Sequence, residues 1–189
     1  WLSGASGSGK TTLSLLLEAL GGGLACRLEG NVLTEPGLRQ VLRSHTYMMI
    51  LDEFEESKHR DKIIENLRSA GHGGKGAQGS TRGEAVVYEI KHMILVASIE
   101  TGLIRAAEQY RYLQVHTEKD NTIRPTIPAP ADCEALQVKL VAYALWAIGR
   151  AKNLLHHMEP VAGHDNRWIA SIAVPLSMLA VSDENPAET

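Results

Sequence analysis

The chain has 189 residues, 44% of them hydrophobic and 22% charged, and its formal net charge is −3. This composition argues against a disordered or fibrous chain, and the charge offers no bulk attraction to nucleic acid or to a membrane, so a polyanion would need a local basic loop. Cys26 and Cys133 lack zinc-site spacing and no apolar run is long enough to span a membrane, so we expect a cytoplasmic protein without a membrane partner.

The first motif is a phosphate loop. Residues 4–11, GASGSGKT, match GxxxxGK[ST] and run into an apolar helix that we expect to end at three glycines, residues 21–23. In such a loop the backbone N–H groups surround the phosphates, Lys10 reaches the β and γ phosphates, and the Thr11 hydroxyl is offered to Mg²⁺. The residues expected to bind ATP are Gly4, Ala5, Ser6, Gly7, Ser8, Gly9, Lys10, Thr11 and Thr12.

A buried strand ending in two carboxylates is the second motif. Residues 24–30 predict a short strand, and Thr34 is the expected N-cap of a following helix. The continuous apolar run 47–51 then predicts a strand buried on both faces, with Asp52 and Glu53 at its exit.

We expect Asp52 to hold Mg²⁺ together with Thr11, either directly or through another ligand of the ion, and Glu53 to orient and deprotonate an attacking water. An enzyme that passes phosphate to an acceptor needs no water-activating glutamate at this position, so the pair favours hydrolysis over transfer. The alternative is a pair of solvated carboxylates at a strand end.

A polar helix is predicted over residues 56–70. Residues 71–83 hold six glycines with Lys75 and Arg82, show no periodicity, and therefore predict a mobile loop. Strands follow at residues 85–88 and 93–98. The second of these strands ends in Ser98, which either helps to hold the attacking water or is an ordinary exposed serine.

The remaining elements are a helix at 103–109, a strand at 110–115, a proline-rich connector and a long amphipathic helix from Leu136 to Leu155. A further helix is expected from Asp165, split at Pro175. The predicted organisation is an ATPase core over 1–120, a connector over 121–131 and a helical region over 132–189. A group of polar residues near the end is expected to be solvated and not to bind metal, because Pro160 breaks its geometry; its members are His156, His157, Glu159, His164 and Asp165.

Strands separated by helices predict an α/β fold with a mainly parallel sheet. The order of phosphate loop, strand and helix, hhhhDE, polar helix, glycine-rich loop and hhhhAS resembles the additional-strand ATPases of the AAA+ and superfamily 3 helicase type. More narrowly, MMILDEFE, the stretch from Asn66 to Ile99 and RYLQVHTEK resemble the ATPase module of phage and plasmid primase-helicase proteins, over roughly Trp1 to Lys119. We therefore expect a fragment of a longer polypeptide whose first strand is cut short at Trp1.

This resemblance implies a three-layer P-loop NTPase of the AAA+/RecA-like type with a C-terminal helical extension. It also implies an ATP-hydrolysing motor that assembles as a homo-oligomeric ring on DNA. Lys75 and Arg82 would contact the DNA backbone, unless they are incidental cations of a surface loop. Arg111, or else Arg68 or Arg167, would act on the γ-phosphate of a neighbouring subunit, unless it is an ordinary salt-bridged arginine.

Two other functions remain open at this stage. One is an AAA+-like ATPase that remodels or loads a protein partner, and the other is a nucleotide-dependent assembly switch without helicase activity. Adenine is favoured over guanine because no NKxD stretch is evident.

Overall fold

The computed structural model divides the chain into two compact units. The described residues are 1–42, 48–68, 75–79, 85–89, 92–109, 111–122 and 126–157. One unit, which we call the sheet unit, comprises Trp1–Gly102 and Gln114–Pro130. The other, which we call the helical unit, comprises Leu103–Leu113 and Ala131–Thr189. The phosphate loop and the Asp-Glu pair both belong to the sheet unit.

A five-stranded, all-parallel sheet organises the sheet unit. In spatial order its strands are β2 (Ala25–Glu29), β3 (Met48–Asp52), β6 (Met93–Ser98), β1 (Leu2–Gly4) and β7 (Val115–Thr117). β6 therefore lies between the strand that leads into the phosphate loop and the strand that ends in Asp52. Parallel strands joined through helices form the α/β arrangement predicted from the sequence, which is confirmed at this level.

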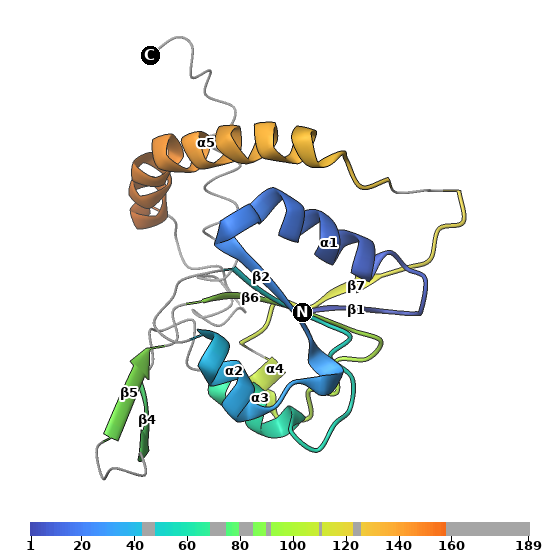
Figure 1. Cartoon of the computed structure of the whole chain (residues 1–189), viewed down its shortest axis with the longest axis vertical. Helices are drawn as coiled ribbons and strands as arrows, with labels where there is room; N and C mark the ends of the chain where they lie inside the picture. Colours follow the sequence, from blue (N-terminus) through green and yellow to red (C-terminus); the bar gives the residue numbers. More distant parts are fainter. Residues whose placement is uncertain are drawn as a thin grey trace. The chain divides into compact units, whose positions relative to one another are not determined.

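Helices cover both faces of this sheet and give the unit three layers (Figure 1). α1 (Lys10–Gly21) lies on one face, where it contacts β2, β3 and β6. α2 (Glu35–Leu42) and α3 (Arg60–Leu67) pack together on the other face. Two 3₁₀ turns flank β2, at Gly22–Leu24 and Gly30–Val32.

The predicted helix boundaries in this unit follow from local chemistry. α1 ends at the glycines, where Gly22 takes a φ of 49° and its N–H donates to the Glu18 carbonyl. Thr34 caps α2, because its Oγ1 accepts a hydrogen bond from the Gly37 N–H at 3.2 Å. α3 is shorter than predicted and begins at Arg60 rather than Glu56, after a turn at residues 58 and 59.

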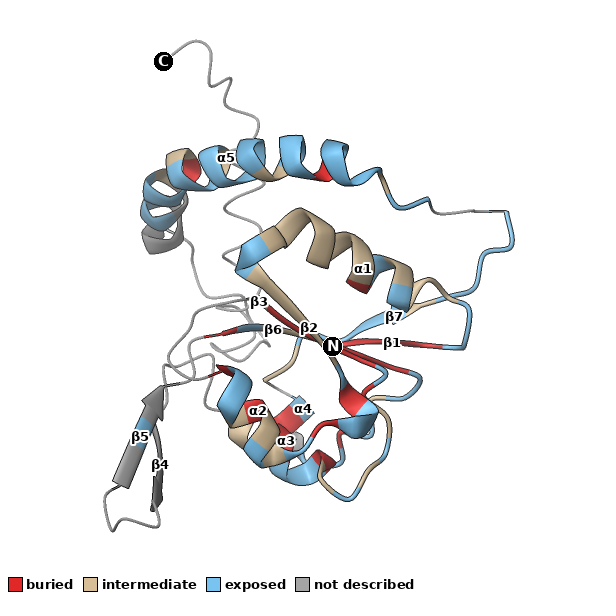
Figure 2. Cartoon of the chain, viewed as in Figure 1, coloured by how far each residue is buried: buried red, intermediate tan, exposed pale blue. Residues whose placement is uncertain are grey.

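The core is centred on β3 and its neighbours (Figure 2). Met49, Ile50 and Leu51 have no exposed surface, so side chains on both faces of this strand are covered, as the continuous apolar run predicts. Each such side chain contributes about 1.5–3 kcal/mol by leaving water. The strand that carries Asp52 is thus held rigidly at the centre of the unit.

The prediction of a mobile loop over residues 71–83 is wrong for part of that range. β4 (Lys75–Gly79) pairs antiparallel with β5 (Ala85–Glu89) and forms a separate two-stranded sheet. Strand pairing uses backbone hydrogen bonds and does not depend on side-chain type. β4 includes two glycines and shows no alternation of apolar and polar residues, so the sequence pattern did not reveal it. The strand predicted at 85–88 is confirmed as β5.

Two later elements also differ from the prediction. The last strand of the sheet is Val115–Thr117 and not residues 110–115, because this edge strand is largely exposed and carries no apolar run, whereas the apolar residues before it lie in the helical unit. The helix predicted at 103–109 is present only as α4 (Ala106–Gln109).

The long C-terminal helix is confirmed as α5 (Pro130–His157). It begins at Pro130, one residue before the predicted end of the connector. Proline is favoured at the first position of a helix, where its missing N–H costs nothing. The helix predicted from Asp165 lies outside the described residues. Across the part of the chain that is described, no helix is both long enough and apolar enough to cross a membrane.

Candidate nucleotide site

The phosphate loop connects β1 to α1 and depends on glycine conformation. Gly4, Gly7 and Gly9 have φ values of 151°, 80° and 87°, in a range that residues other than glycine rarely adopt. Space is as restrictive as conformation at Gly4, where an added Cβ would lie 2.2 Å from the carbonyl oxygen of Thr117. The first glycine of the motif therefore allows the last strand of the sheet to approach the loop.

β7 supports this loop from a distant part of the sequence. The Thr117 hydroxyl donates to the Ser3 carbonyl at 3.0 Å and lies 2.8 Å from the Ser8 hydroxyl. On the other side, the Gly4 N–H donates to the Ile99 carbonyl beyond the end of β6. The loop is consequently held between β6 and β7 before any ligand is bound.

Lys10 and the start of α1 both place positive charge at the loop. The Lys10 ammonium donates to the carbonyls of Gly4 at 2.6 Å and Ala5 at 2.9 Å, so its charge lies over the loop. Gly9 caps the helix without a side-chain hydrogen bond, and no acidic residue occupies the first turn. The positive end of the helix dipole is thus neither capped by a side chain nor neutralised by a first-turn carboxylate.

Asp52 meets the phosphate loop from the end of β3. Its side chain is only 2% exposed, and its Oδ1 lies 3.5 Å from the Thr11 hydroxyl, which donates to it. The same oxygen accepts the backbone N–H of Glu53 at 3.2 Å. The structure thus brings together the two residues that the sequence assigned to Mg²⁺.

These two residues fit a magnesium ion. A hydroxyl and a carboxylate are hard oxygen ligands, and Mg²⁺ in nucleotide sites takes its other ligands from phosphates and water. Among the described residues, no group of three or more His, Cys, Asp or Glu side chains is placed to hold a metal by itself. The site therefore suits a metal delivered with a nucleotide.

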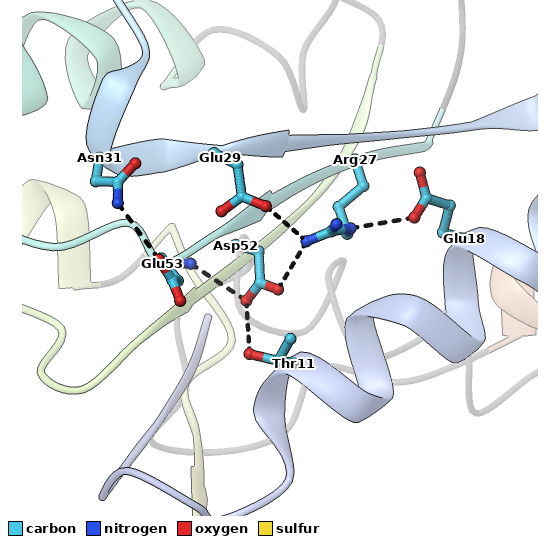
Figure 3. Close-up of polar contacts among 7 residues, drawn as sticks. All are labelled: Thr11, Glu18, Arg27, Glu29, Asn31, Asp52 and Glu53. Carbon is cyan, nitrogen blue, oxygen red and sulfur yellow. Dashed lines mark hydrogen bonds and ion pairs between the residues drawn. The ribbon is translucent and has the colours of Figure 1, made fainter. Parts of the chain in front are cut away.

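Arg27 is a member of this site that the sequence reasoning missed (Figure 3). It projects from β2, and its guanidinium contacts Glu18 at 3.1 Å, Glu29 at 3.0 Å and Asp52 at 3.2 Å. Although burial acts to lower it, the hydrogen bond to Glu18 and the three carboxylate charges raise the pKa of Arg27. The sequence did contain an indication of its pairing with Glu29, because the two residues are two positions apart in a strand and so share a face.

Burial, together with the charge of Glu18, raises the pKa of the neighbouring Cys26 thiol. This thiol is therefore less readily ionised than a free cysteine and is a poor nucleophile at neutral pH.

Glu53 has a strained backbone and an exposed side chain. Its φ of 51° is the only positive φ among the non-glycine residues that the structure describes. Its Oε2 accepts a hydrogen bond from the Asn31 amide at 3.3 Å (Figure 3). Such conformations cost about 1–3 kcal/mol and concentrate at functional sites.

Ser98 lies at the end of β6 but its hydroxyl is already engaged. It accepts a hydrogen bond from the Trp1 indole at 2.7 Å and donates one to the Glu100 carbonyl at 2.6 Å. The residue is 1% exposed. Its contacts therefore connect strand ends and do not point to the carboxylates.

The other predicted site residues belong to other elements or lie outside the described residues. Arg111 belongs to the helical unit, and Arg68 follows α3 in the sheet unit. Lys75 begins β4, while Arg82 and Arg167 lie outside the described residues. Within the phosphate loop, Ala5 and Ser6 are exposed and Thr12 is half-buried on α1.

Comparison with protein-family models and with curated proteins gave no match for this chain.

Proposed function

We propose that this chain binds MgATP at residues 4–12 and hydrolyses the γ-phosphate, as a P-loop ATPase of the additional-strand type. The observation that carries the proposal is the meeting of Thr11 and Asp52, 3.5 Å apart, beside a glycine loop that holds the Lys10 ammonium. Ligands of parallel α/β sheets bind at the carboxyl ends of the strands. Asp52 is the last residue of β3, and Thr11 lies in the first turn of the helix that follows β1.

The strand order also supports this proposal. β6 separates β1 from β3, so one additional strand lies between the phosphate loop and the carboxylates. That arrangement agrees with the resemblance to AAA+ and superfamily 3 ATPases noted in the sequence.

Each residue has a defined task in the proposed reaction. The loop N–H groups bind the phosphates, and Lys10 exchanges its contacts with the Gly4 and Ala5 carbonyls for phosphate oxygens. Thr11 and Asp52 would hold the metal, which would supply positive charge against the charge developing on the γ-phosphate. Positioning and electrostatics supply most of the catalysis in phosphoryl transfer, and a rigid β3 suits that requirement.

Glu53 is the proposed general base. It follows Asp52 directly, and its left-handed backbone turns the chain so that the next residue, Phe54, returns to the core. Among the described residues the exposed carboxylate accepts one hydrogen bond, from Asn31, so it is available to accept a proton from water.

The substrate of the motor is a further part of the proposal. We propose that hydrolysis drives movement of a homo-oligomeric ring along DNA, on the basis of the resemblance and of the β4–β5 hairpin that begins at Lys75. Remodelling or loading of a protein partner, and a slow assembly switch, are the competing functions.

The test of ATP hydrolysis compares the wild-type chain with Lys10→Ala, Glu53→Gln and Glu56→Gln. Lys10→Ala should lose nucleotide binding, and Glu53→Gln should bind ATP but turn it over at least about 100-fold more slowly. Glu56 is an exposed carboxylate three residues further on, so its variant is the matched control and should keep full turnover. Wild-type levels of turnover in Glu53→Gln would remove this glutamate from the mechanism.

The test of the substrate adds single-stranded DNA or a protein partner to the same assay. Stimulation by DNA that is lost in a Lys75→Ala, Arg82→Ala double variant supports the motor. Turnover indifferent to DNA leaves the ATPase proposal standing and contradicts the helicase. Stimulation by a protein alone favours remodelling or loading.

A further inference from the structure

Arg27 is placed where three elements meet. In the β2–β3 register, Glu29 is opposite Asp52, and Arg27 is opposite Ile50. From there the guanidinium uses Nη1 for both Glu29 and Asp52, and Nε for Glu18 on α1. The same helix begins with Lys10 and Thr11, so Arg27 connects the body of the phosphate-loop helix to the strand that carries Asp52 (Figure 3).

The two oxygens of Asp52 have different partners as a result. Oδ1 accepts from the Thr11 hydroxyl and from the Glu53 N–H, whereas Oδ2 is paired with Arg27. A carboxylate that is 2% exposed and contacted on both sides cannot turn freely. Only Oδ1 is left facing the phosphate loop.

Charge is the second consequence of this geometry. Glu18, Glu29 and Asp52 are three carboxylates that share one guanidinium, so the cluster keeps an excess of negative charge. Removing Arg27 would increase this excess by one unit beside the oxygen that faces Thr11. A divalent cation near Thr11 would then be attracted more strongly.

We propose that Arg27 is a positioning residue that keeps Oδ1 of Asp52 facing Thr11 and weakens the attraction of this carboxylate for Mg²⁺. The inference rests on the proposed nucleotide site and adds a control of metal affinity to it. A site that holds Mg²⁺ less tightly releases the metal with the product more readily after each turnover.

The test measures the dissociation constant of a fluorescent ATP analogue with Mg²⁺ and with EDTA, and takes the ratio of the two as the metal coupling. Arg27→Gln should raise this coupling roughly threefold to tenfold, as expected for one unit charge acting on a divalent cation across several ångströms of largely aqueous dielectric. Turnover should fall, because Asp52 is no longer oriented.

Two further variants separate charge from structure. Arg27→Lys keeps the charge but cannot contact three carboxylates with the same geometry, so its coupling should stay within about twofold of wild type while its turnover falls several-fold. Arg39→Gln is the matched control, because Arg39 is similarly shielded, at 17% exposure against 22% for Arg27, and pairs with Glu35 on α2. It should change neither quantity.

The outcomes are distinguishable from failure of the ATPase proposal. The coupling requires binding and not hydrolysis, so a wild-type chain that binds but does not hydrolyse ATP overturns the ATPase and still tests Arg27. Unchanged coupling in Arg27→Gln overturns the inference. A rise in coupling of about threefold or more in Arg27→Lys also overturns it, and this result does not require a folded glutamine variant. Wild-type binding that is indifferent to Mg²⁺ overturns both proposals.

Discussion

Arg27 and Arg60 both belong to the sheet unit, but the partners of Arg27 are charged and those of Arg60 are neutral. Arg27 contacts three carboxylates, those of Glu29 and Asp52 at the ends of β2 and β3 and that of Glu18 on α1. Arg60, at the start of α3, is 6% exposed and donates to the carbonyls of Thr101 and Glu100. Its guanidinium also lies 5.5 Å from the ring centre of Trp1 and 5.6 Å from that of Phe54.

This difference indicates which property each arginine affects, the stability of the fold or the nucleotide site. Carbonyls and aromatic rings are neutral, so Arg60 acts as a packed cation that joins α3 to the end of β6, and its loss is expected to affect stability. The partners of Arg27 are charged and one of them is the candidate metal ligand. Its loss is therefore expected to affect the nucleotide site more than the fold.

The largest expected effect is on ATP turnover and comes from changing Asp52, a partner of Arg27. Asp52→Asn removes the charge that faces Thr11 and should lower ATP turnover about 100-fold, equivalent to roughly 3 kcal/mol of transition-state stabilisation. Steady-state turnover at saturating MgATP measures this loss. Asp61→Asn, a change at an exposed carboxylate on α3, should have no effect; equal losses in both variants would contradict a specific role for Asp52.

Arg60→Ala should act on stability instead. Losing the two part-buried hydrogen bonds and the contacts with Trp1 and Phe54 should lower the free energy of unfolding by about 2–3 kcal/mol. Urea denaturation measures the change, while nucleotide affinity of the folded protein should be retained. Arg105→Ala is the control, because that arginine is 65% exposed with a weak 3.7 Å ion pair, and should change stability by less than about 0.5 kcal/mol.

Gly102→Ala tests the same region with a smaller change. An added Cβ would lie 2.6 Å from Nη1 of Arg60, and the φ of +53° is unfavourable for alanine, so a loss of about 1–2 kcal/mol is expected. Gly23→Ala, where nothing lies within 4 Å, should change the unfolding free energy little. Equal midpoints of denaturation for the two variants would contradict this expectation and would show that the Arg60 side chain can move away from the added Cβ at little cost in free energy.

Ser98→Ala tests whether this serine affects stability, as we expect for Arg60, or the nucleotide site, as we expect for Arg27. Its contacts with Trp1 and Glu100 predict a loss of about 1 kcal/mol in stability and turnover within about threefold of wild type. A turnover loss greater than about tenfold in a stably folded variant would instead favour the predicted role in holding the attacking water.

The elements that could be predicted from the sequence are those with a strong local pattern. GxxxxGKT requires a glycine turn before a helix, and the short apolar run before Asp52 favours a strand covered on both faces. β4 and β7 carry no such pattern, because one is rich in glycine and the other is an exposed edge strand. Their positions depend on partners that are distant in the sequence.

The candidate site divides in the same way. Lys10, Thr11, Asp52 and Glu53 lie inside motifs whose chemistry is readable residue by residue. Arg27 does not, because its contact with Asp52 depends on the register between β2 and β3 and its contact with Glu18 on how α1 lies over the sheet. Sequence spacing shows which face of a strand a residue shares, but not which helix covers that face.

The support that Thr117 gives to Gly4 and Ser8 has a consequence for biosynthesis. A nascent chain that has emerged only as far as residue 110 already contains every residue of the phosphate-loop motif, yet it lacks the strand against which that loop is held. The loop therefore gains this support only after β7 has joined the sheet. If the proposed ATP site is correct, we expect the nucleotide to stabilise the folding chain only from that point on.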